Sequence, residues 1–302
     1  MGFEECDEIV QSLLSRVENF ICKDGNNLTV IPDVFLYRQS KPMERSFFLS
    51  EPLVTVVLQG RVSLLLGHDE LICDRGNYVL STVRGLPVLA RVDDISPGYP
   101  YTVFGFKLDL QMIRQVLIDH DVAFPLLKKA SSGRGMTVGK TTVDLLHALQ
   151  RLLSLLDRPE DIPALYGGIK YEIIYRLLTS EEGERLREIA IAGTRGNRIA
   201  KVVEWIHKHY REPLKVEELA SESGMGVSTL YHHFHEITAM SPLQYQKMLR
   251  LTEARRLMLE ENCDAGGAAF QVGYESQSQF SREYRRLFGT PPLRDIKALL
   301  KR

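Results

Sequence analysis

Three histidines, His232, His233 and His235, fall within four consecutive positions of the stretch YHHFHEITAMSP at 231–242. Such a density of imidazoles suits three kinds of chemistry. The ring nitrogens can hold a transition metal, move protons beside a nucleophile, or donate hydrogen bonds to a nucleic acid. Which of these applies depends on the directions in which the surrounding helix turns the three rings.

The predicted helix separates the three rings. At about 100° per residue, its apolar face points into a core through Leu230, Phe234 and Ile237. His232 and His235 point roughly the opposite way, and His233 lies on the flank. Neither face offers a cysteine or a carboxylate at a suitable spacing for a third ligand, so we expect no metal there. Nothing nearby resembles a nucleophile or an orienting acid, so we expect no catalytic residue either.

A later stretch of the chain repeats the one that carries the histidines. LASESGMGVSTLYHHFHEITAMSP (219–242) is similar to AAFQVGYESQSQFSREYRRLFGTPP (268–292), with one more residue in the turn of the second copy. Each copy has a short helix, a turn with a glycine (Gly224 or Gly273) and a second helix, which is the order of a helix-turn-helix unit. The sequence PLQYQKMLRLTEARRLMLEE (242–261) predicts one long helix between the two units.

The second helix of the later copy also has two different faces. Its core-facing positions are Phe280, Tyr284 and Leu287. Its opposite face carries Ser278, Arg282 and Arg285. Arginine, histidine, serine and glutamine donate hydrogen bonds to base edges and phosphates. A solvated polar face would explain one such helix, but two related helices with matching outward faces favour a nucleic-acid interface.

These C-terminal motifs resemble the DNA-binding domain of the AraC/XylS family of bacterial transcription regulators. The first unit matches through ELA, GMGVSTLYHHF, SPLQYQ and RLTEARRLM, and the second through VGYESQSQFSREYRRLFGTPP, over about residues 198–296. The resemblance implies a regulator, not an enzyme, that binds double-stranded DNA in two adjacent major grooves, with RNA polymerase as a further partner. It implies base contacts at Ser228, Tyr231, His232, Gln277, Ser278 and Arg282, and the outward position of Arg285 adds that residue as a further DNA-binding side chain.

Two departures from the family pattern concern glycines. Gly226 replaces the serine that is usual at the start of the first recognition helix, and glycine caps a helix without a side-chain hydrogen bond. Gly266 and Gly267 fall in the first helix of the second unit, where each costs about 1 kcal/mol relative to alanine. We therefore expect the second unit to be the looser one.

Residues 29–108 are predicted to form strands. TVI, VFLYR, SFFL, PLVTVVLQG, RVSLLLG, NYVLSTV, PVLARV and YTVFGFKLDL are short, rich in aliphatic and aromatic residues, and separated by Gly, Pro and Asp. Such spacing indicates a small barrel or sandwich. LYRQSKP (36–42), EPLVTVVLQGRVSLLLG (51–67) and GNYVLSTVRGLPVLARV (76–92) resemble the cupin-like N-terminal domain of one AraC subgroup. That resemblance implies a β-barrel around a small-molecule effector.

A metal-dependent cupin enzyme with an appended helical domain is an alternative. Enzymatic cupins hold their metal with a His-x-His pair, a glutamate and a later histidine, whereas residues 29–108 contain one histidine, His68. We therefore expect no metal and no cofactor. Arg38 and Arg91 would bind an anionic effector if their side chains point into the barrel, and the sequence leaves their direction open.

From Leu110 to about Gly193 the pattern is helical. TTVDLLHALQRLLSLL has one apolar stripe with steps of three and four, formed by Val143, Leu146, Leu149, Leu152, Leu153 and Leu156. The stripe packs on the barrel or forms the interface of a homodimer, and the sequence leaves both open. A regulator controlled by a protein partner through the helices at 139–180 is a second alternative.

The whole chain is predicted to be an α+β protein of two domains. Residues 1–193 form the cupin-like domain for effector sensing and dimerisation, and residues 194–302 form the all-α DNA-binding domain. From Arg195 to Arg302 there are 17 Lys and Arg against 13 Asp and Glu, although the whole chain has a net charge of −1, which suits a polyanionic partner. Four dispersed cysteines, an acidic start without a signal-peptide core and no stretch of membrane-spanning length lead us to expect a cytoplasmic protein.

Overall fold

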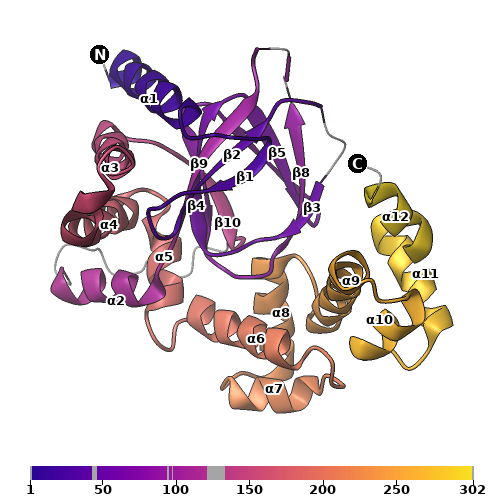
Figure 1. Ribbon diagram of the computed structural model, residues 1–302. Helices are drawn as coiled ribbons and strands as arrows, with labels where there is room; N and C mark the ends of the chain where they lie inside the picture. Colours follow the sequence, from indigo (N-terminus) through magenta and orange to yellow (C-terminus); the bar gives the residue numbers. More distant parts are fainter. Residues whose placement is uncertain (1, 43–45, 94, 97, 121–132, 301–302) are drawn as a thin grey trace. The chain divides into compact units, whose positions relative to one another are not determined.

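The computed structural model describes residues 2–42, 46–93, 95–96, 98–120 and 133–300 of the chain. It divides into two compact units, Met1–Ala200 (unit 1) and Lys201–Arg302 (unit 2). Figure 1 shows that the β-structure belongs to unit 1 and that unit 2 is built of helices. None of the described helices combines the length and the apolar character that a membrane crossing requires. The functional boundary at 193/194 stays a prediction.

Ten strands of unit 1 form two antiparallel sheets. The strands are β1 (Gly25–Leu28), β2 (Val34–Gln39), β3 (Ser46–Leu49), β4 (Leu53–Gln59), β5 (Arg61–Leu66), β6 (Asp69–Asp74), β7 (Asn77–Ser81), β8 (Pro87–Asp93), β9 (Tyr101–Lys107) and β10 (Met136–Lys140). One sheet has the order β1-β2-β9-β4-β7-β10 and the other the order β3-β8-β5-β6. The predicted α+β class is confirmed. A closed barrel is not confirmed, because the strands are hydrogen-bonded in two separate sheets.

Side chains alternate across the six-stranded sheet. Val34, Leu36, Val54 and Val56 belong to a buried cluster with the helices of unit 1. Phe35 lies between the first two in sequence and Thr55 between the last two, and both line a cavity on the opposite face. This is the period of two that a strand imposes on its side chains. The six-stranded sheet thus has one face covered by helices and one face directed at the cavity.

The helices of unit 1 complete its core. They are α1 (Gly2–Glu18), α2 (Leu110–Asp119), α3 (Val143–Ser154), α4 (Ile162–Thr179) and α5 (Gly183–Ala190), with a short 3₁₀ turn, η2 (Pro159–Asp161). The apolar stripe of α3 is buried in the core cluster, where α3 packs against α1 and α4. The stripe therefore packs inside unit 1 and does not form a dimer interface, because its leucines are buried and cannot contact a second copy of the chain.

Two segments of unit 1 differ from the sequence-based expectation. TVI at 29–31 is not a strand; the ladder with β2 is formed by the preceding GNNL as β1. Within the stretch expected to be helical, MTVGK forms β10 beside β7, and Gly139 lies where an added Cβ would be 2.3 Å from Cζ of Tyr78. Glycine there lets the tyrosine ring cross the strand. Residues 121–132 of the expected helical stretch lie outside the described residues.

Unit 2 contains two helical repeats on one long helix. α6 (Arg195–His209) leads into it, followed by α7 (Val216–Glu222), α8 (Val227–Thr238), α9 (Pro242–Glu260), α10 (Ala265–Gln271), α11 (Gln277–Phe288) and α12 (Pro292–Leu299). The pairs α7–α8 and α10–α11 are the two predicted helix-turn-helix units. α9 begins with a capping box in which Ser241 and Gln244 satisfy each other's backbone N–H groups. The expectation of a long joining helix is confirmed.

Candidate nucleic-acid interface

α8 and α11 are equivalent helices fifty residues apart in sequence. Each has 12 residues, ends in a left-handed residue (Ala239 or Gly289) and precedes a helix that begins at a proline. The turns that lead into them contain Gly224 and Gly273, both at positive φ. A Cβ on Gly273 would lie 2.3 Å from the carbonyl oxygen of Arg211, so the close approach of that chain requires glycine.

The exposed face of α8 carries the first set of predicted contacts. Leu230, Phe234 and Ile237 are buried, as the periodicity predicts. Ser228 and His232 are exposed, and Tyr231 is half-buried beside them. These three side chains therefore occupy the free side of a helix whose other side is fixed in a core, and they can meet a partner without unfolding.

The exposed face of α11 carries the second set. Phe280 and Tyr284 are fully buried, and Leu287 is half-buried against the same core. Gln277, Ser278, Arg282 and Arg285 are all exposed. Within the described part of the chain neither arginine forms an ion pair, so both cations are free for an anionic partner. Ser276 caps the helix by accepting a hydrogen bond from the N–H of Gln279, whereas Gly226 caps α8 without one.

Arg250 on α9 fixes the helix-turn-helix units to the joining helix. Its guanidinium donates hydrogen bonds to the carbonyl oxygens of Tyr210 (2.6 Å) and Gly273 (2.8 Å), and also to those of Arg211 and Glu212. One planar group thus joins the segment that follows α6 to the turn between α10 and α11. Burial lowers the pKa of Arg250. The four carbonyl oxygens oppose this effect, because they accept hydrogen bonds from the charged guanidinium.

A second network fixes α11 against its neighbours. Arg255 on α9 binds both carboxylate oxygens of Asp295 on α12, at 2.8 and 3.1 Å. The hydroxyl of Tyr284 donates to the same carboxylate at 2.8 Å. Burial is the main cause that raises the pKa of Tyr284, and this hydrogen bond is the second. The polar face of α11 is therefore presented from a helix whose inner side is held by both apolar packing and buried hydrogen bonds.

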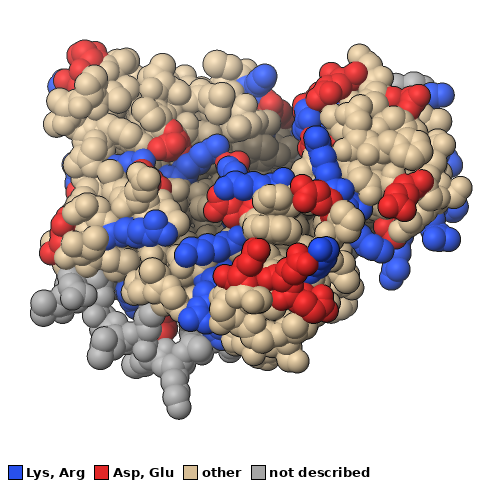
Figure 2. Space-filling model, turned by 90° about the horizontal axis from the view of Figure 1, so that it is seen from below, with Lys and Arg blue, Asp and Glu red and all other residues tan. Residues whose placement is uncertain are grey.

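The charges of the molecule are mixed. Figure 2 shows Lys and Arg side chains interspersed with Asp and Glu on the face that it presents. Many of the basic side chains are already paired; Arg256 of α9, for example, contacts Glu253, Glu260 and Glu261. The unpaired Arg282 and Arg285 matter more for a polyanion than the small excess of positive charge in this third of the chain.

Gly266 and Gly267 lie in the first turn of α10. Asp264 caps this helix and accepts a hydrogen bond from the N–H of Gly267 at 2.6 Å. A Cβ on Gly267 would lie 3.1 Å from Sγ of Cys263, whereas a Cβ on Gly266 would meet its nearest atom at 3.4 Å. The helix forms despite both glycines because its cap and its buried alanines fix it. The greater looseness expected for this unit stays a prediction.

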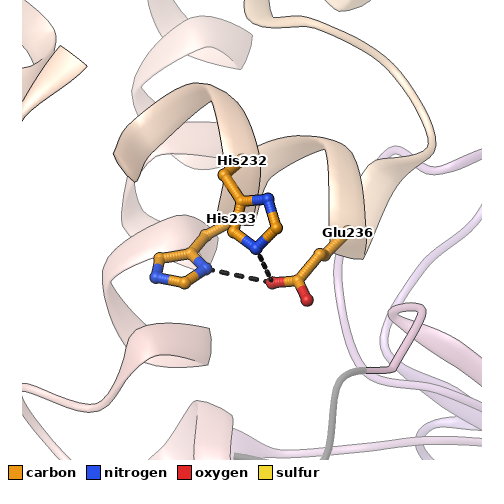
Figure 3. A group of neighbouring side chains, drawn as sticks. All are labelled: His232, His233 and Glu236. Atoms are coloured by element: carbon orange, nitrogen blue, oxygen red, sulfur yellow. Dashed lines mark hydrogen bonds and ion pairs between the residues drawn. The ribbon is translucent and has the colours of Figure 1, made fainter. Parts of the chain in front are cut away.

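The histidines do not stand alone on α8. Nε2 of His232 lies 3.7 Å from Oε2 of Glu236, and Nδ1 of His233 lies 3.0 Å from the same oxygen. Figure 3 shows both rings turned toward this carboxylate. The expectation that no carboxylate lies at a suitable spacing was wrong, because positions three and four residues apart share a helix face. The pair expected on one face was His232 and His235, whereas the group contains His233 and not His235.

Unit 1 contains a cavity of about 440 Å³ between its two sheets. Side chains from both sheets line it, among them Phe35, Val62, Val92 and Val103. Tyr37 and Tyr101 also face it, in an edge-to-face pair with ring centroids 6.3 Å apart, and burial raises the pKa of both phenols. The volume lies within the range of about 300–1,000 Å³ typical of small-molecule sites.

Most of the surface of this cavity is apolar, and the polar side chains among its lining residues are Asn26, Tyr37, Ser46, Ser50, Glu51, Thr55, Ser81 and Tyr101. Glu51 is the charged residue among the described lining residues, and its carboxylate is paired with Lys107 at 2.9 Å. The hydroxyl of Ser81 is buried and has no hydrogen-bond partner among the described residues. A buried polar atom without a partner costs about 1–3 kcal/mol, which a bound ligand could offset by supplying one. Sequence reasoning did not identify either residue, because a serine on a strand and a glutamate in the connection before β4 carry no motif.

Arg38 and Arg91 lie outside this cavity. Arg38 follows the cavity-lining Tyr37 on β2 and pairs with Asp24 at 3.1 Å. Arg91 lies between the lining residues Ala90 and Val92 on β8 and pairs with Asp93 at 2.9 Å. The alternation of side chains along a strand directs both guanidinium groups to the other face. The inward direction that an effector role would require of them is not observed.

Comparisons with known proteins agree with this architecture. A model of the AraC-type transcriptional regulator N-terminus matches residues 30–185, and a helix-turn-helix domain model matches residues 219–297. The fold and the paired recognition helices are those of an AraC-type regulator. Since the N-terminal model alone matches half of the chain, the chain belongs to the AraC family of transcriptional regulators.

Individual relatives are more distant. The transcriptional activator RhaS of Escherichia fergusonii is 28% identical over 157 residues, which are 50% of this chain and 55% of that protein. The thermoregulatory protein LcrF of Yersinia pestis is 26% identical over 148 residues, 49% of this chain and 54% of LcrF. The match thus spans about half the length of these curated relatives. A crystal structure of ToxT from Vibrio cholerae has a TM-score of 0.55 at 12% identity, covers 87% of this chain and 97% of ToxT, and supports the fold alone.

Proposed function

We propose that this protein is a sequence-specific, double-stranded DNA-binding transcription regulator whose N-terminal unit binds a small effector. The observation that carries the proposal is the pair of equivalent helices, α8 and α11, each with a buried apolar face and an exposed face of hydrogen-bond donors. A helix fits the major groove of B-DNA, and two helices on one rigid joining helix suit two successive grooves. Family membership supports the same conclusion.

The types of the exposed side chains indicate which of them contact bases and which contact phosphates. His232, Arg282 and the neighbouring serines are donors that discriminate between bases from within the groove. Arg285 is assigned to the phosphates, where its charge adds affinity without sequence information. The chromosome as partner implies a cytoplasmic location. RNA polymerase and a second copy of the chain are further partners of this proposal, and neither has a surface that the geometry singles out.

The cavity narrows the class of effector. Its surface is mostly apolar, its one charged lining residue, Glu51, is acidic and already paired, and the hydroxyl of Ser81 is buried without a partner among the described residues. An anion would bury its charge without a cation, which is costly. We therefore infer an uncharged, largely apolar effector that can form a hydrogen bond with Ser81, in place of the anionic one considered from Arg38 and Arg91. ToxT has been crystallised with an unsaturated fatty acid. The carboxylate of such a ligand would find no lysine, arginine or histidine among the described residues that line the cavity of the present chain.

Non-enzymatic action is part of the proposal. The described lining residues of the cavity include no histidine, cysteine or lysine, and their one carboxylate, Glu51, is paired with Lys107, so a set of several metal ligands is lacking there. Metal analysis of the purified His233→Ala variant distinguishes the alternative of a cupin-type enzyme, because such an enzyme requires one tightly held ion in unit 1 and keeps it when the side-chain group on α8 is broken. Control by a protein partner through the helices at 139–180 is distinguished by screening unit 1 for thermal stabilisation with small apolar molecules.

The experiment that tests the DNA-binding proposal is a selection from random-sequence duplexes with the full-length protein. We expect enrichment of one site with two short conserved blocks about 10 base pairs apart. Affinity for that site should fall steeply as salt increases, because phosphate contacts release counterions. The proposal fails if no sequence is enriched over bulk competitor DNA at any salt concentration.

A further inference from the structure

The side-chain group formed by His232, His233 and Glu236 has the ligand types of a transition-metal site. Two imidazole nitrogens and one carboxylate oxygen all lie within 4.8 Å of one another on a single helix. The two oxygen–nitrogen distances are 3.0 and 3.7 Å. In a tetrahedral zinc site with bonds of 2.0–2.1 Å, ligand atoms lie about 3.3–3.4 Å apart, between these two values. Small rotations of the rings would bring both nitrogens to that separation.

The group is held together by its own helix. Glu236 lies four residues after His232 and three after His233, so α8 stacks the carboxylate beside both rings (Figure 3). The side chains of His233 and Glu236 are only 24% and 20% exposed, whereas that of His232 is 69% exposed. Two ligands are therefore restrained by packing, and the third faces solvent, where water can complete the coordination.

We propose that this group binds one divalent transition-metal ion of the zinc class, and that the bound metal competes with DNA. The second part rests on the proposed function, because His232 is one of the predicted base contacts. A ring nitrogen that coordinates a metal carries no hydrogen, so it cannot donate to a base. The ion and its water would also occupy the exposed face of α8. Linkage requires the effect to be mutual, so that DNA also weakens metal binding.

The donor set determines which metals bind. Imidazole nitrogen with one carboxylate suits Zn²⁺, Ni²⁺ and Cu²⁺, whereas Mg²⁺ and Ca²⁺ prefer shells of oxygen ligands. Zinc is thus the probe, and magnesium at the same concentration is the matched control for charge and ionic strength.

The metal site is tested by titrating zinc into the full-length protein against a chromogenic chelator. We expect His233→Ala and Glu236→Gln each to lose one zinc equivalent relative to the parent protein. Neither residue belongs to the predicted base contacts, and circular dichroism verifies that each variant is folded. His235→Ala is the control, since it removes an exposed imidazole from the same helix outside the group. The metal site is overturned if the two variants retain the same number of zinc equivalents as the parent.

The competition is tested with the same proteins in a mobility-shift assay on the selected DNA site. At a free zinc concentration about ten times the zinc dissociation constant, the parent should lose about tenfold in DNA affinity, while His233→Ala and magnesium should give no change. Loss of a zinc equivalent in the variants without any zinc effect on DNA affinity of the parent would overturn the competition. If zinc binds as expected and no DNA sequence is preferred, the metal site stands and the proposed function fails.

Discussion

His232 and Arg282 occupy equivalent positions on α8 and α11, fifty residues apart, and both are exposed. Their neighbours on the opposite helix face, Phe234 and Tyr284, are fully buried. We expect each exposed side chain of this set to contact a few base pairs, whereas each buried one holds its helix in place. The two kinds of residue should therefore respond to substitution in different assays.

His232→Ala and Arg282→Ala should each reduce discrimination at a few base pairs. A good base contact contributes about 1–3 kcal/mol of discrimination against the wrong base. Mobility shifts on single-base variants of the selected site measure this loss, and circular dichroism verifies the fold. Arg286→Ala, which removes an exposed arginine of α11 outside the predicted set, should leave sequence preference unchanged. Unaltered preference in both test variants would contradict the assignment.

Ser81→Ala tests the cavity at the same scale. Because the buried hydroxyl has no partner among the described residues, its removal should leave the effector-free protein as stable or more stable, by up to about 1 kcal/mol. Thermal denaturation measures this. Ser50→Ala is the matched control, since its hydroxyl donates to the carbonyl of Val83 and accepts from the N–H of Leu86. A clear destabilisation by Ser81→Ala would show that the hydroxyl is already satisfied.

Elements present these side chains because their inner faces are fixed. Phe234 of α8 packs edge-to-face on Tyr245 of α9, with ring centroids 5.5 Å apart. Arg250, also on α9, binds carbonyls at the end of α6 and at the turn before α11. The joining helix is therefore the common frame of both recognition helices, and damage to it should affect both at once.

Phe234→Ala should destabilise unit 2 by about 3–5 kcal/mol, the usual cost of removing a fully buried phenylalanine. Urea denaturation followed by circular dichroism measures the change in the transition of this unit. His235→Ala, the next residue and exposed, should alter stability by less than about 0.5 kcal/mol. Equal effects of the two substitutions would place α8 in a different packing from the one described.

Arg250→Lys should weaken the frame although the charge is kept. A lysine ammonium is a point charge and cannot reproduce a planar fork that reaches four carbonyl oxygens. We expect a loss of about 2–3 kcal/mol in the free energy of unfolding. DNA affinity should fall for both halves of the site together, which footprinting can follow. A variant as stable as the parent would show that charge alone is sufficient.

Several elements of this fold were predictable from the sequence, for identifiable reasons. α8 and α11 could be predicted because the sequence contains the same pattern twice and because their buried residues follow the helical period. β10 was missed because MTVGK is five residues long and its partner, β7, lies more than fifty residues earlier. α1 was not predicted, although Ile9, Val10, Leu13 and Val17 form an apolar stripe that the structure buries.

The candidate sites show the same limits. The polar faces of the recognition helices follow from periodicity and resemblance. The cavity does not, because its lining comes from two sheets whose pairing no local pattern reveals. Glu236 was available to sequence reasoning, since its spacing of three and four residues from the histidines places it on their side of the helix. The directions of the three imidazoles alone do not reveal it, because the acidic ligand lies one turn further along the helix.

On the scale of the whole molecule, unit 1 offers a largely apolar cavity and unit 2 offers two exposed helix faces. An effector in the first can change DNA binding by the second only through a difference in its affinity for two states of the protein. A factor of ten in DNA affinity would require about 1.4 kcal/mol of such coupling. The same size of effect is expected from zinc, by direct competition at α8.

The central claim is that α8 and α11 enter successive major grooves, and guanine N7 methylation interference on the selected site tests it most directly. N7 lies in the major groove, so its methylation blocks side chains that read that groove. The account predicts two patches of interference about 10 base pairs apart, with the patch under α8 weakened in His232→Ala and the patch under α11 weakened in Arg282→Ala. A single patch, or two patches that neither substitution changes, would contradict it.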